Sequence, residues 1–202
     1  LDFDGTDDYL KGVDTLVSAG QACTVAVAFI PDITLTGCLL RSDSNNWRLQ
    51  YDTSFYCTSF TTSGSDSLIG GVCNTGAVNI LVLRYSTTEG ELRANGAQVA
   101  TDSGFVGTTQ LLNDISMGRL TAGVQQFNGK MLEMVIDNRS LTAGEITQLE
   151  EYLTTKWVTT PVYSDTAWDA VTLRGPTSED SLTTFTETVA ARHWWVQLGC
   201  SV

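Results

Sequence analysis

Short apolar runs alternate with turn-forming residues along most of this chain, and no other feature constrains its fold as much. In Trp47–Tyr51 the odd positions are apolar and the even ones polar, the period of a strand with one face in a core. Asn95-Gly96 separates two such runs, and this dipeptide signals a hairpin because a type I′ turn needs positive φ twice. Threonine, which is β-branched and favours strands, supplies 29 of the 202 residues. The pattern predicts an all-β antiparallel sandwich or barrel.

The predicted strands are short segments bounded by turn residues. They are Cys23–Ile30, Gly37–Arg41, Trp47–Tyr51, Ser54–Thr61, Asn79–Tyr85, Glu91–Ala94, Ala97–Thr101, Asp114–Arg119 and Lys130–Asp137. Cys23, Cys38 and Cys57 fall in or beside these runs, where a free thiol behaves as a small core residue; one or two disulfides are the alternative. The five cysteines show no CxxC or Cys/His spacing, which argues against a zinc site.

One helix is predicted, and it begins after Leu141. Thr142 followed three residues later by Glu145 forms a capping box, and Leu141 and Ile146 are spaced for a hydrophobic staple. An apolar stripe at helical spacing follows, made of Ile146, Leu149, Leu153 and Trp157. The predicted polar face carries Glu150, Glu151 and Lys156. We expect the stripe to pack on the sandwich and the helix to end near Trp157.

Charge excludes two classes of partner. Asp+Glu number 23 against 11 Lys+Arg, so the formal net charge is −12. Such a surface repels phosphate backbones and anionic lipid, so nucleic acid is not an expected partner. No apolar window approaches the roughly 20 residues that span a bilayer, so membrane insertion is not expected either. The chain begins at Leu1 without a secretory signal, and we expect a processed product or a piece of something longer.

The residues after Trp157 differ in composition from those before it. The segment 158–202 is rich in Thr, Ser, Asp and Pro, and the adjacent Trp194 and Trp195 must be covered by something. We therefore predict one domain over residues 1–157 and an extension over 158–202. The extension is interpreted either as two or three further strands or as an arm that contacts a neighbour, with His193, Trp194 and Trp195 as assembly residues.

Several segments resemble laminin-G-like domains of the concanavalin A-like lectin/glucanase superfamily. They are the opening Leu1–Leu10, the paired runs Asn79–Tyr85 and Glu91–Gly96, Ile115–Arg119, and Phe127–Ile136 with Asn138–Ile146. Their order and spacing cover roughly residues 1–157. The resemblance implies a two-sheet antiparallel jelly-roll β-sandwich with one short C-terminal helix. It leaves function open, because the superfamily includes lectins, adhesion modules, glycoside hydrolases and domains on phage particles and bacterial surfaces.

Catalysis is not expected. Laminarinase-type relatives carry their carboxylates on one strand as E-x-D-x-x-E or E-x-D-x-E, and this chain has no such run; Glu133 and Asp137 come nearest. Glu133 matches a structural position of the family, and Val135 stands where a middle carboxylate is needed. The lone His193 has no nucleophile motif beside it.

Calcium is a candidate cofactor because lectin-like and laminin-G-like relatives often bind it through loop oxygens. One candidate loop contains Asp43, Asn45 and Asn46, and the other contains Asp4, Asp7 and Asp8. The alternative is that these are ordinary turn residues that bond to their own backbone.

Sugar binding needs an exposed aromatic ring beside amides and charged groups. The candidate group is Asn45, Asn46, Trp47, Arg48 and Gln50. The alternation places Trp47 and Tyr51 on the side of Leu49, which favours a core position and turns Arg48 and Gln50 to solvent.

The sequence favours a non-catalytic surface or assembly module. A virion structural protein, such as a capsid decoration, fibre or tail adhesin, is the interpretation that the resemblance supports, with other copies of the chain or other virion proteins as partners. The alternative is a lectin-like, carbohydrate-binding module of a secreted or cell-surface bacterial protein. Either would place the chain on a virion surface or outside a cell.

Overall fold

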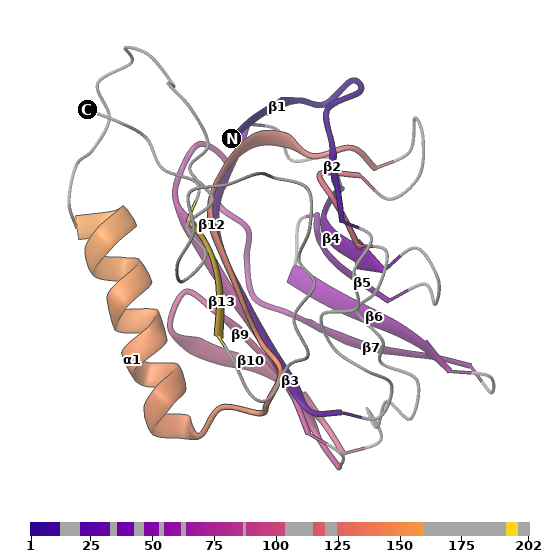
Figure 1. Cartoon of the computed structure of the whole chain (residues 1–202), viewed down its shortest axis with the longest axis vertical. Coiled ribbons are helices and arrows are strands. Elements are labelled where there is room, and N and C mark those ends of the chain that lie inside the picture. Colours follow the sequence, from indigo (N-terminus) through magenta and orange to yellow (C-terminus); the bar gives the residue numbers. More distant parts are fainter. Residues whose placement is uncertain are drawn as a thin grey trace, which may run out of the picture.

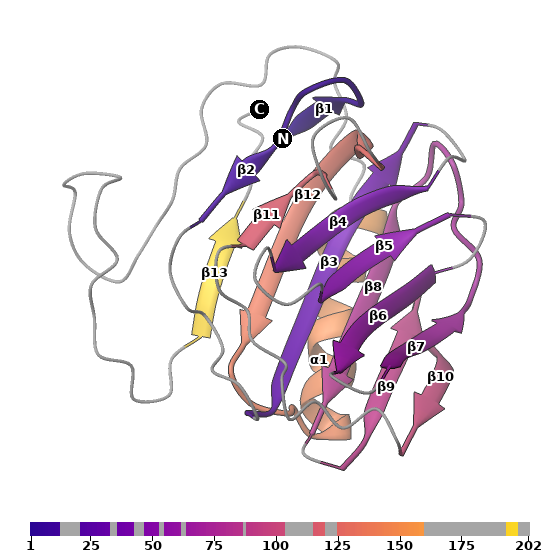
Figure 2. The same cartoon turned by 90° about the vertical axis from the view of Figure 1, so that its right-hand side faces the viewer.

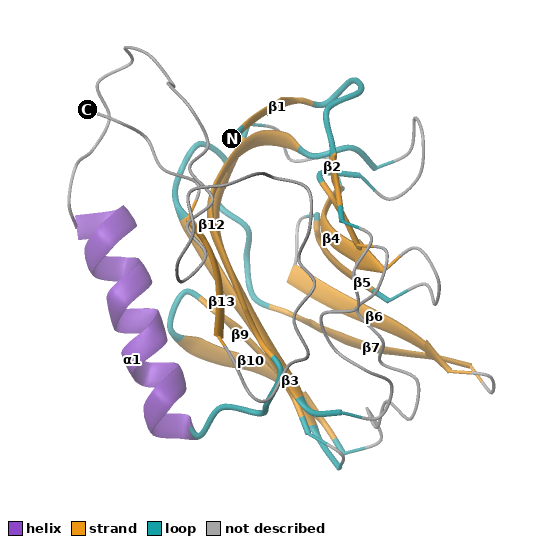
Figure 3. Cartoon of the chain, viewed as in Figure 1, coloured by secondary structure: helices purple, strands orange, loops and turns teal. Residues whose placement is uncertain are grey.

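Two antiparallel sheets stack face to face, and one helix lies against the outer face of one of them (Figures 1 and 3). The computed structural model describes residues 1–12, 21–32, 36–42, 47–52, 55–61, 64–86, 88–103, 115–119, 125–159 and 193–197. The β-sandwich and the short C-terminal helix confirm the fold class that the sequence predicts. No helix in these ranges is long and apolar enough to cross a membrane.

The larger sheet has seven strands and carries the helix. Six of them follow the order β1-β12-β3-β8-β9-β10, and β13 pairs with β12. Their bounds are β1 Asp2–Asp4, β12 Asn128–Asp137, β3 Cys23–Pro31, β8 Asn79–Tyr85, β9 Gly90–Ala94, β10 Ala97–Asp102 and β13 His193–Gln197. The β9–β10 turn has the predicted geometry, since φ is 51° at Asn95 and 82° at Gly96.

The smaller sheet has six strands in the order β2-β11-β4-β5-β6-β7 and faces the viewer in Figure 2. Their bounds are β2 Leu10–Lys11, β11 Ile115–Met117, β4 Gly37–Ser42, β5 Arg48–Tyr51, β6 Phe55–Thr61 and β7 Gly64–Gly70. Among the described residues, no helix covers the outer face of this sheet. The two sheets therefore differ in what lies on their outer sides.

The main core fills the space between the sheets. At its centre the rings of Phe29, Tyr51 and Phe127 contact one another, with centroids 5.4–6.1 Å apart. Offset and edge-on aromatic packing of this kind adds to the burial of the rings themselves. Trp47 is only 1% exposed and belongs to the same core, which confirms its predicted core position. Cys23 and Cys38 are buried free thiols, and burial raises the pKa of Cys23 to about 12.

A second, smaller core lies between the seven-stranded sheet and α1, which spans Ala143–Thr154 and continues into the π-helical turn η1, Thr155–Thr159. The predicted capping box is present: the Thr142 hydroxyl accepts from the Glu145 N–H, and Glu145 Oε2 accepts from the Thr142 N–H at 2.8 Å. The predicted stripe of Ile146, Leu149, Leu153 and Trp157 is buried against the sheet. Glu150, predicted to be solvent-exposed, is instead buried because Arg93 of β9 binds it through two bonds of 2.9 Å.

Apart from β13, three strands were not among the predicted ones, and β7 shows why. It begins with Gly, Ser and Asp and has no apolar alternation; within residues 67–70, Leu68 enters the core and Ile69 is exposed. Such an edge strand needs few apolar residues because only one of its faces is covered. The other two, β1 and β2, are two or three residues long, too short to show a period.

The β13 strand pairs with β12 of its own chain. Its five residues oppose Glu133–Asp137, while β1 covers the neighbouring part of the same edge, Asn128–Lys130. The other predicted further strands of the C-terminal extension lie outside the described residues.

Candidate functional site

A row of residues crosses the outer face of the six-stranded sheet. Successive Cα partners place one residue of each strand in register: Lys11, Ser116, Arg41, Arg48, Thr58 and Ser67. We call this the basic row. The adjoining inward row of Leu40, Leu49 and Leu68 packs in the main core, so alternation directs Arg41, Arg48 and Ser67 outward. The outer face therefore presents three basic side chains along one line.

The exposure of the basic row varies along its length. Lys11 and Ser67 are exposed, Arg41 and Arg48 are half-buried, and Ser116 is buried. Arg48 is the one residue of the basic row that was also predicted to belong to the sugar site. Arg41 lies directly opposite Arg48, and Lys11 is two strands further along.

Gln50 lies two residues beyond Arg48 on the same outer face, opposite Cys38. The alternation predicted that the Gln50 side chain faces solvent. This prediction is wrong, because the side chain is fully buried. Among the described residues, neither the oxygen nor the nitrogen of its amide has a hydrogen-bond partner. A buried amide without a partner costs free energy, so the feature calls for a physical explanation.

The rest of the predicted sugar site divides in two. Trp47 points into the core, where it has no exposed ring face for a sugar to stack on. Asn45 and Asn46 lie outside the described residues, as does Asp43, so the predicted calcium loop at 43–46 stays a prediction.

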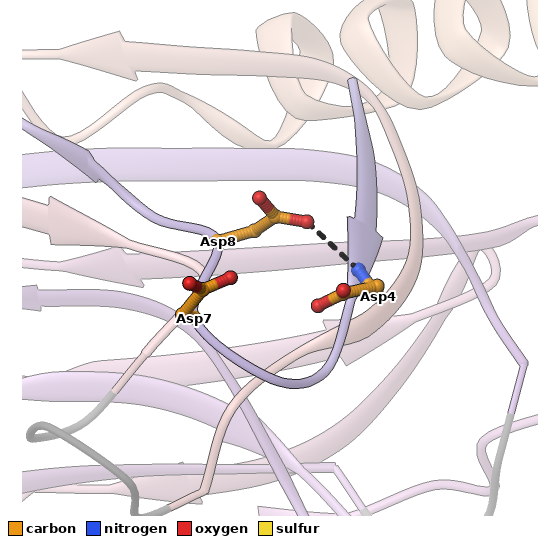
Figure 4. A group of neighbouring side chains, drawn as sticks. All are labelled: Asp4, Asp7 and Asp8. Atoms are coloured by element: carbon orange, nitrogen blue, oxygen red, sulfur yellow. Dashed lines mark hydrogen bonds between the residues drawn. The ribbon is translucent and has the colours of Figure 1, made fainter.

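The second predicted acidic loop is described and joins β1 to β2 (Figure 4). Carboxylate oxygens of Asp4, Asp7 and Asp8 all lie within 4.8 Å of one another, and the three residues are exposed. Asp8 Oδ2 accepts from the Asp4 N–H at 3.0 Å, and Asp4 Oδ1 accepts from the Thr6 N–H at 2.7 Å. The turn residues thus bond to their own backbone, as the alternative interpretation expected.

Side chains at and just before the start of β12 hold this loop in place. The Asn128 amide donates to the Asp4 carbonyl at 3.1 Å, and the Gln126 amide donates to the Thr6 carbonyl. Gly5 has φ of 76°, and a Cβ there would lie 2.9 Å from the Asn128 side chain. Oxygen ligands at this spacing suit one Ca²⁺ ion, which takes six to eight oxygens at 2.3–2.6 Å. Three carboxylates supply only part of that number, so solvent would have to provide the rest.

The carboxylates that came nearest to a catalytic pair are occupied by structural contacts. Glu133 is 1% exposed, and its oxygens accept from Tyr152 Oη at 3.0 Å and Trp157 Nε1 at 2.7 Å, with Lys156 Nζ at 3.1 Å. Asp137, also buried, accepts from the Arg139 backbone N–H at 3.2 Å. Glu133 therefore anchors α1 and η1 to the sheet.

The sequence signals for the basic row were present but could not be combined. Arg48 lies between the apolar Trp47 and Leu49, and Arg41 ends an apolar run, which favours an outward position for each. Ser116 and Lys11 join them only because β11 pairs with both β4 and β2, and these strands are far apart in sequence.

Comparison with known proteins places this architecture in a family. A model of the concanavalin A-like lectin/glucanases superfamily matches residues 4–147, and the chain belongs to that superfamily. No curated protein matches the chain by sequence.

Solved structures of other proteins share the fold at low sequence identity. Domain 4 of AbnA, an extracellular GH43 arabinanase of Geobacillus stearothermophilus solved with arabinotriose, superposes with a TM-score of 0.60 at 19% identity, over 73% of this chain and 74% of that one. A heptameric SAP-like pentraxin of Limulus polyphemus gives 0.59 at 14%, over 74% and 80%. The CBM40 module of a Ruminococcus gnavus IT-sialidase, bound to α2,3 sialyllactose, gives 0.55 at 16%, over 65% and 84%. At these identities the likeness shows the fold alone.

Proposed function

We propose that this protein is a non-catalytic, lectin-like module that binds glycans through the outer face of its six-stranded sheet. The observation that carries the proposal is the contrast between its two outer faces. One is covered by α1 and its carboxylates hold that helix, whereas the other lacks a helix among the described residues and presents the basic row. Charged and polar side chains on an outward face can hold sugar hydroxyls and acidic substituents.

Two observations support binding rather than hydrolysis. The buried pair Glu133 and Asp137 accepts hydrogen bonds from protein groups, so neither is poised as a general acid or nucleophile. Several solved structures with this fold are carbohydrate-binding modules or are described with a bound oligosaccharide, which makes the same use of the fold plausible for this chain.

The acidic loop would add calcium to this function. If Asp4, Asp7 and Asp8 hold a Ca²⁺ ion, calcium binds only the folded chain and must raise the melting temperature. A melting temperature that does not change at millimolar calcium would leave the loop as a simple turn.

A glycan array and affinity columns test the main proposal. The full chain should be retained by at least one oligosaccharide, and free sugar of the same kind should release it. An Arg48→Gln variant should be retained less, whereas Arg139→Gln, on the helix-covered side of the sandwich, should behave as the unmodified chain. A chain that no glycan retains would contradict the proposal.

Assembly on a virion or bacterial surface is the second candidate, and β13 favours it. This strand completes the edge of β12 after a connection, residues 160–192, that could extend about 100 Å at roughly 3.3 Å per residue. A strand on so long a connection can pair with a neighbouring copy as well as with its own chain, because the register is the same in both cases. His193, Trp194 and Trp195 would then act in assembly through β13.

Native mass measurement distinguishes the two candidates. A symmetric oligomer that becomes a monomer when residues 160–202 are deleted would support assembly through β13. A monomer that keeps its glycan binding after the same deletion would leave the lectin-like function alone. The virion location rests on resemblance alone: the Leu141–Trp157 ending resembles those of domains in phage virion proteins and in bacterial surface proteins. Detection of the chain in purified particles would test it.

A further inference from the structure

One exposed aromatic ring lies at the edge of the six-stranded sheet. Tyr9 directly precedes β2, the edge strand of that sheet (Figure 2), and its side chain is 41% exposed. Among the described residues the only other exposed aromatic side chain is Tyr152 of α1, whose Oη donates to Glu133 at 3.0 Å. Tyr9 is therefore the one described aromatic ring that solvent reaches on the sheet without a helix.

Arg119, which follows β11, covers one face of this ring. Its Cζ atom lies 3.1 Å from the centre of the Tyr9 ring, so the guanidinium stacks on the ring. With one face covered, the exposed area of Tyr9 belongs to the opposite face and to the edges of the ring. The pair thus offers a flat apolar surface with a cation behind it.

The rest of the fold holds the backbone around this pair. Gly118, next to Arg119, has φ of 88°, and a Cβ there would collide with the ring of Phe3 in the main core. Directly after Tyr9, β2 pairs with β11. A ring that is fixed in advance loses little conformational entropy when a ligand binds, and this favours affinity.

The chemistry of this surface suits a sugar ring. A pyranose has a face of C–H groups, and stacking that face on an aromatic ring removes apolar surface of both partners from water. The sugar hydroxyls also need polar partners at the rim of the ring. The Arg119 guanidinium offers N–H donors. The exposed carboxylates of Asp7 and Asp8, which directly precede Tyr9 in the chain, offer acceptors.

Charge narrows the class of ligand. The two segments that form the pair, residues 1–12 and 115–119, contain four Asp side chains and two basic ones, and the whole chain has a net charge of −12. A sugar that carries a carboxylate is repelled by such a surface, whereas a neutral sugar is not. The ligand that this surface fits is therefore an uncharged sugar with an apolar face.

We propose that Tyr9 is the platform on which a neutral sugar ring stacks, with Arg119 supporting the platform from behind. This inference rests on the proposed glycan-binding function and names the residue and the ligand class that carry it. The site lies at the β2 edge of the six-stranded sheet, two residues before Lys11 at the end of the basic row.

An array of matched trisaccharides tests the inference. Its neutral members are gluco-, galacto- and manno-trisaccharides, and each is paired with the uronic-acid trisaccharide that differs from it at C6. The full chain is applied in EDTA, which keeps Ca²⁺ off the acidic loop. We expect binding to neutral members, and Tyr9→Ala should weaken it at least tenfold because the stacking surface is lost. Tyr9→Phe and Tyr9→Trp should retain it, since each keeps a flat ring.

A second exposed tyrosine serves as the matched control. Tyr152 is 39% exposed on the helix-covered side, so Tyr152→Ala should leave the array signal unchanged even though it removes the bond to Glu133. Melting temperatures verify that each variant folds. Nitration of exposed tyrosines by tetranitromethane gives a measurement on the unmodified chain that needs no variant. The neutral trisaccharide bound on the array should protect Tyr9 from nitration and leave Tyr152 reactive.

The outcomes separate this inference from the function on which it rests. Neutral binding that Tyr9→Ala retains in full, or a bound trisaccharide that leaves Tyr9 as reactive as before, would reduce the Tyr9–Arg119 pair to a structural contact while glycan binding stands. Binding confined to the uronic-acid members would overturn the neutral ligand class. An array on which no member is bound, together with columns that retain nothing, would overturn both this inference and the proposed function.

Discussion

The two sheets of this sandwich have similar inner faces and opposite outer faces. Inside, both contribute large apolar side chains to one core. Outside, the seven-stranded sheet presents Ala26, Ala28 and Val82 to a helix. The six-stranded sheet presents Arg41, Arg48 and Gln50 on its outer side. The difference shows that alternation along a strand determines which residues enter the core, whereas the residues at the other positions determine whether the sheet gains a second layer.

Small residues explain how the helix fits. Alanines at successive outward positions of β3 let α1 approach the sheet closely, and the buried stripe of the helix fills the space. Charged groups between these layers are paired: Arg93 joins Glu91 and Glu150, and the bond to Glu150 raises the pKa of Arg93. This face contributes stability, whereas no helix among the described residues covers the outer face of the six-stranded sheet.

Removing the large aromatic residue of the helix-covered face should have the largest effect. Trp157 is buried in the second core and donates its indole N–H to Glu133. We expect Trp157→Ala to lower the free energy of unfolding by about 3–5 kcal/mol, measured by urea denaturation. Its neighbour Val158 is 52% exposed, so Val158→Ala should change the value by less than about 0.5 kcal/mol. Equal effects of the two variants would contradict the docking of η1.

Replacing the buried carboxylate under the helix should have the next largest effect. Burial acts to lower the pKa of Lys156, but its contacts with Tyr152 and Glu133 outweigh this and raise the pKa. Glu133→Gln keeps the shape and one acceptor but removes the charge, and we expect a loss of about 2–3 kcal/mol in the same denaturation experiment. Glu151→Gln, exposed on the same helix, serves as the control. A loss no larger than that of the control would show that Glu133 does not anchor the helix.

The helix-covered face could be predicted from the sequence because its signals are local. The Thr142–Glu145 capping box, the staple and the four-residue stripe all lie within one short segment, and each is present in the structure. The period-two runs likewise located most strands. The burial of Glu150 could not be predicted, because its partner Arg93 lies on a strand far away in sequence.

The outer face of the other sheet could be predicted only in part. Alternation placed Arg48 outward and Trp47 inward, as observed. It could not align Lys11, Ser116 and Arg41 with Arg48, because register between distant strands depends on pairing that no local pattern specifies. The burial of Gln50 could not be predicted for a related reason. Alternation along a strand gives the direction of a side chain but not what lies above it.

On the outer face of the six-stranded sheet, one substitution should stabilise the chain instead of destabilising it. Gln50→Leu replaces a buried amide that lacks a hydrogen-bond partner with an apolar group of similar volume. We expect it to raise the free energy of unfolding by about 1 kcal/mol, since the cost of the unsatisfied amide disappears. Cys38→Ala, opposite it on β4, should destabilise the chain because it removes buried volume and the weak bond from the thiol to the Leu40 carbonyl at 3.6 Å. Destabilisation by Gln50→Leu would mean that the amide has a partner in solution.

The smallest effect should come from the exposed start of the helix, and it should depend on pH. A hydrogen bond from the Thr142 backbone N–H, together with the Arg139 side chain, lowers the pKa of Glu145 from 4.5 to about 2. A carboxylate with a lowered pKa stabilises the fold above its ordinary pKa, and that contribution is lost as the pH falls from about 4.5 towards 2. Glu145→Gln should therefore lower the melting temperature slightly at pH 7, and the gap should close over this range. Arg139→Gln should remove only part of the gap, because the Thr142 bond persists; a gap that stays constant with pH would show that the charge of Glu145 is not what stabilises α1.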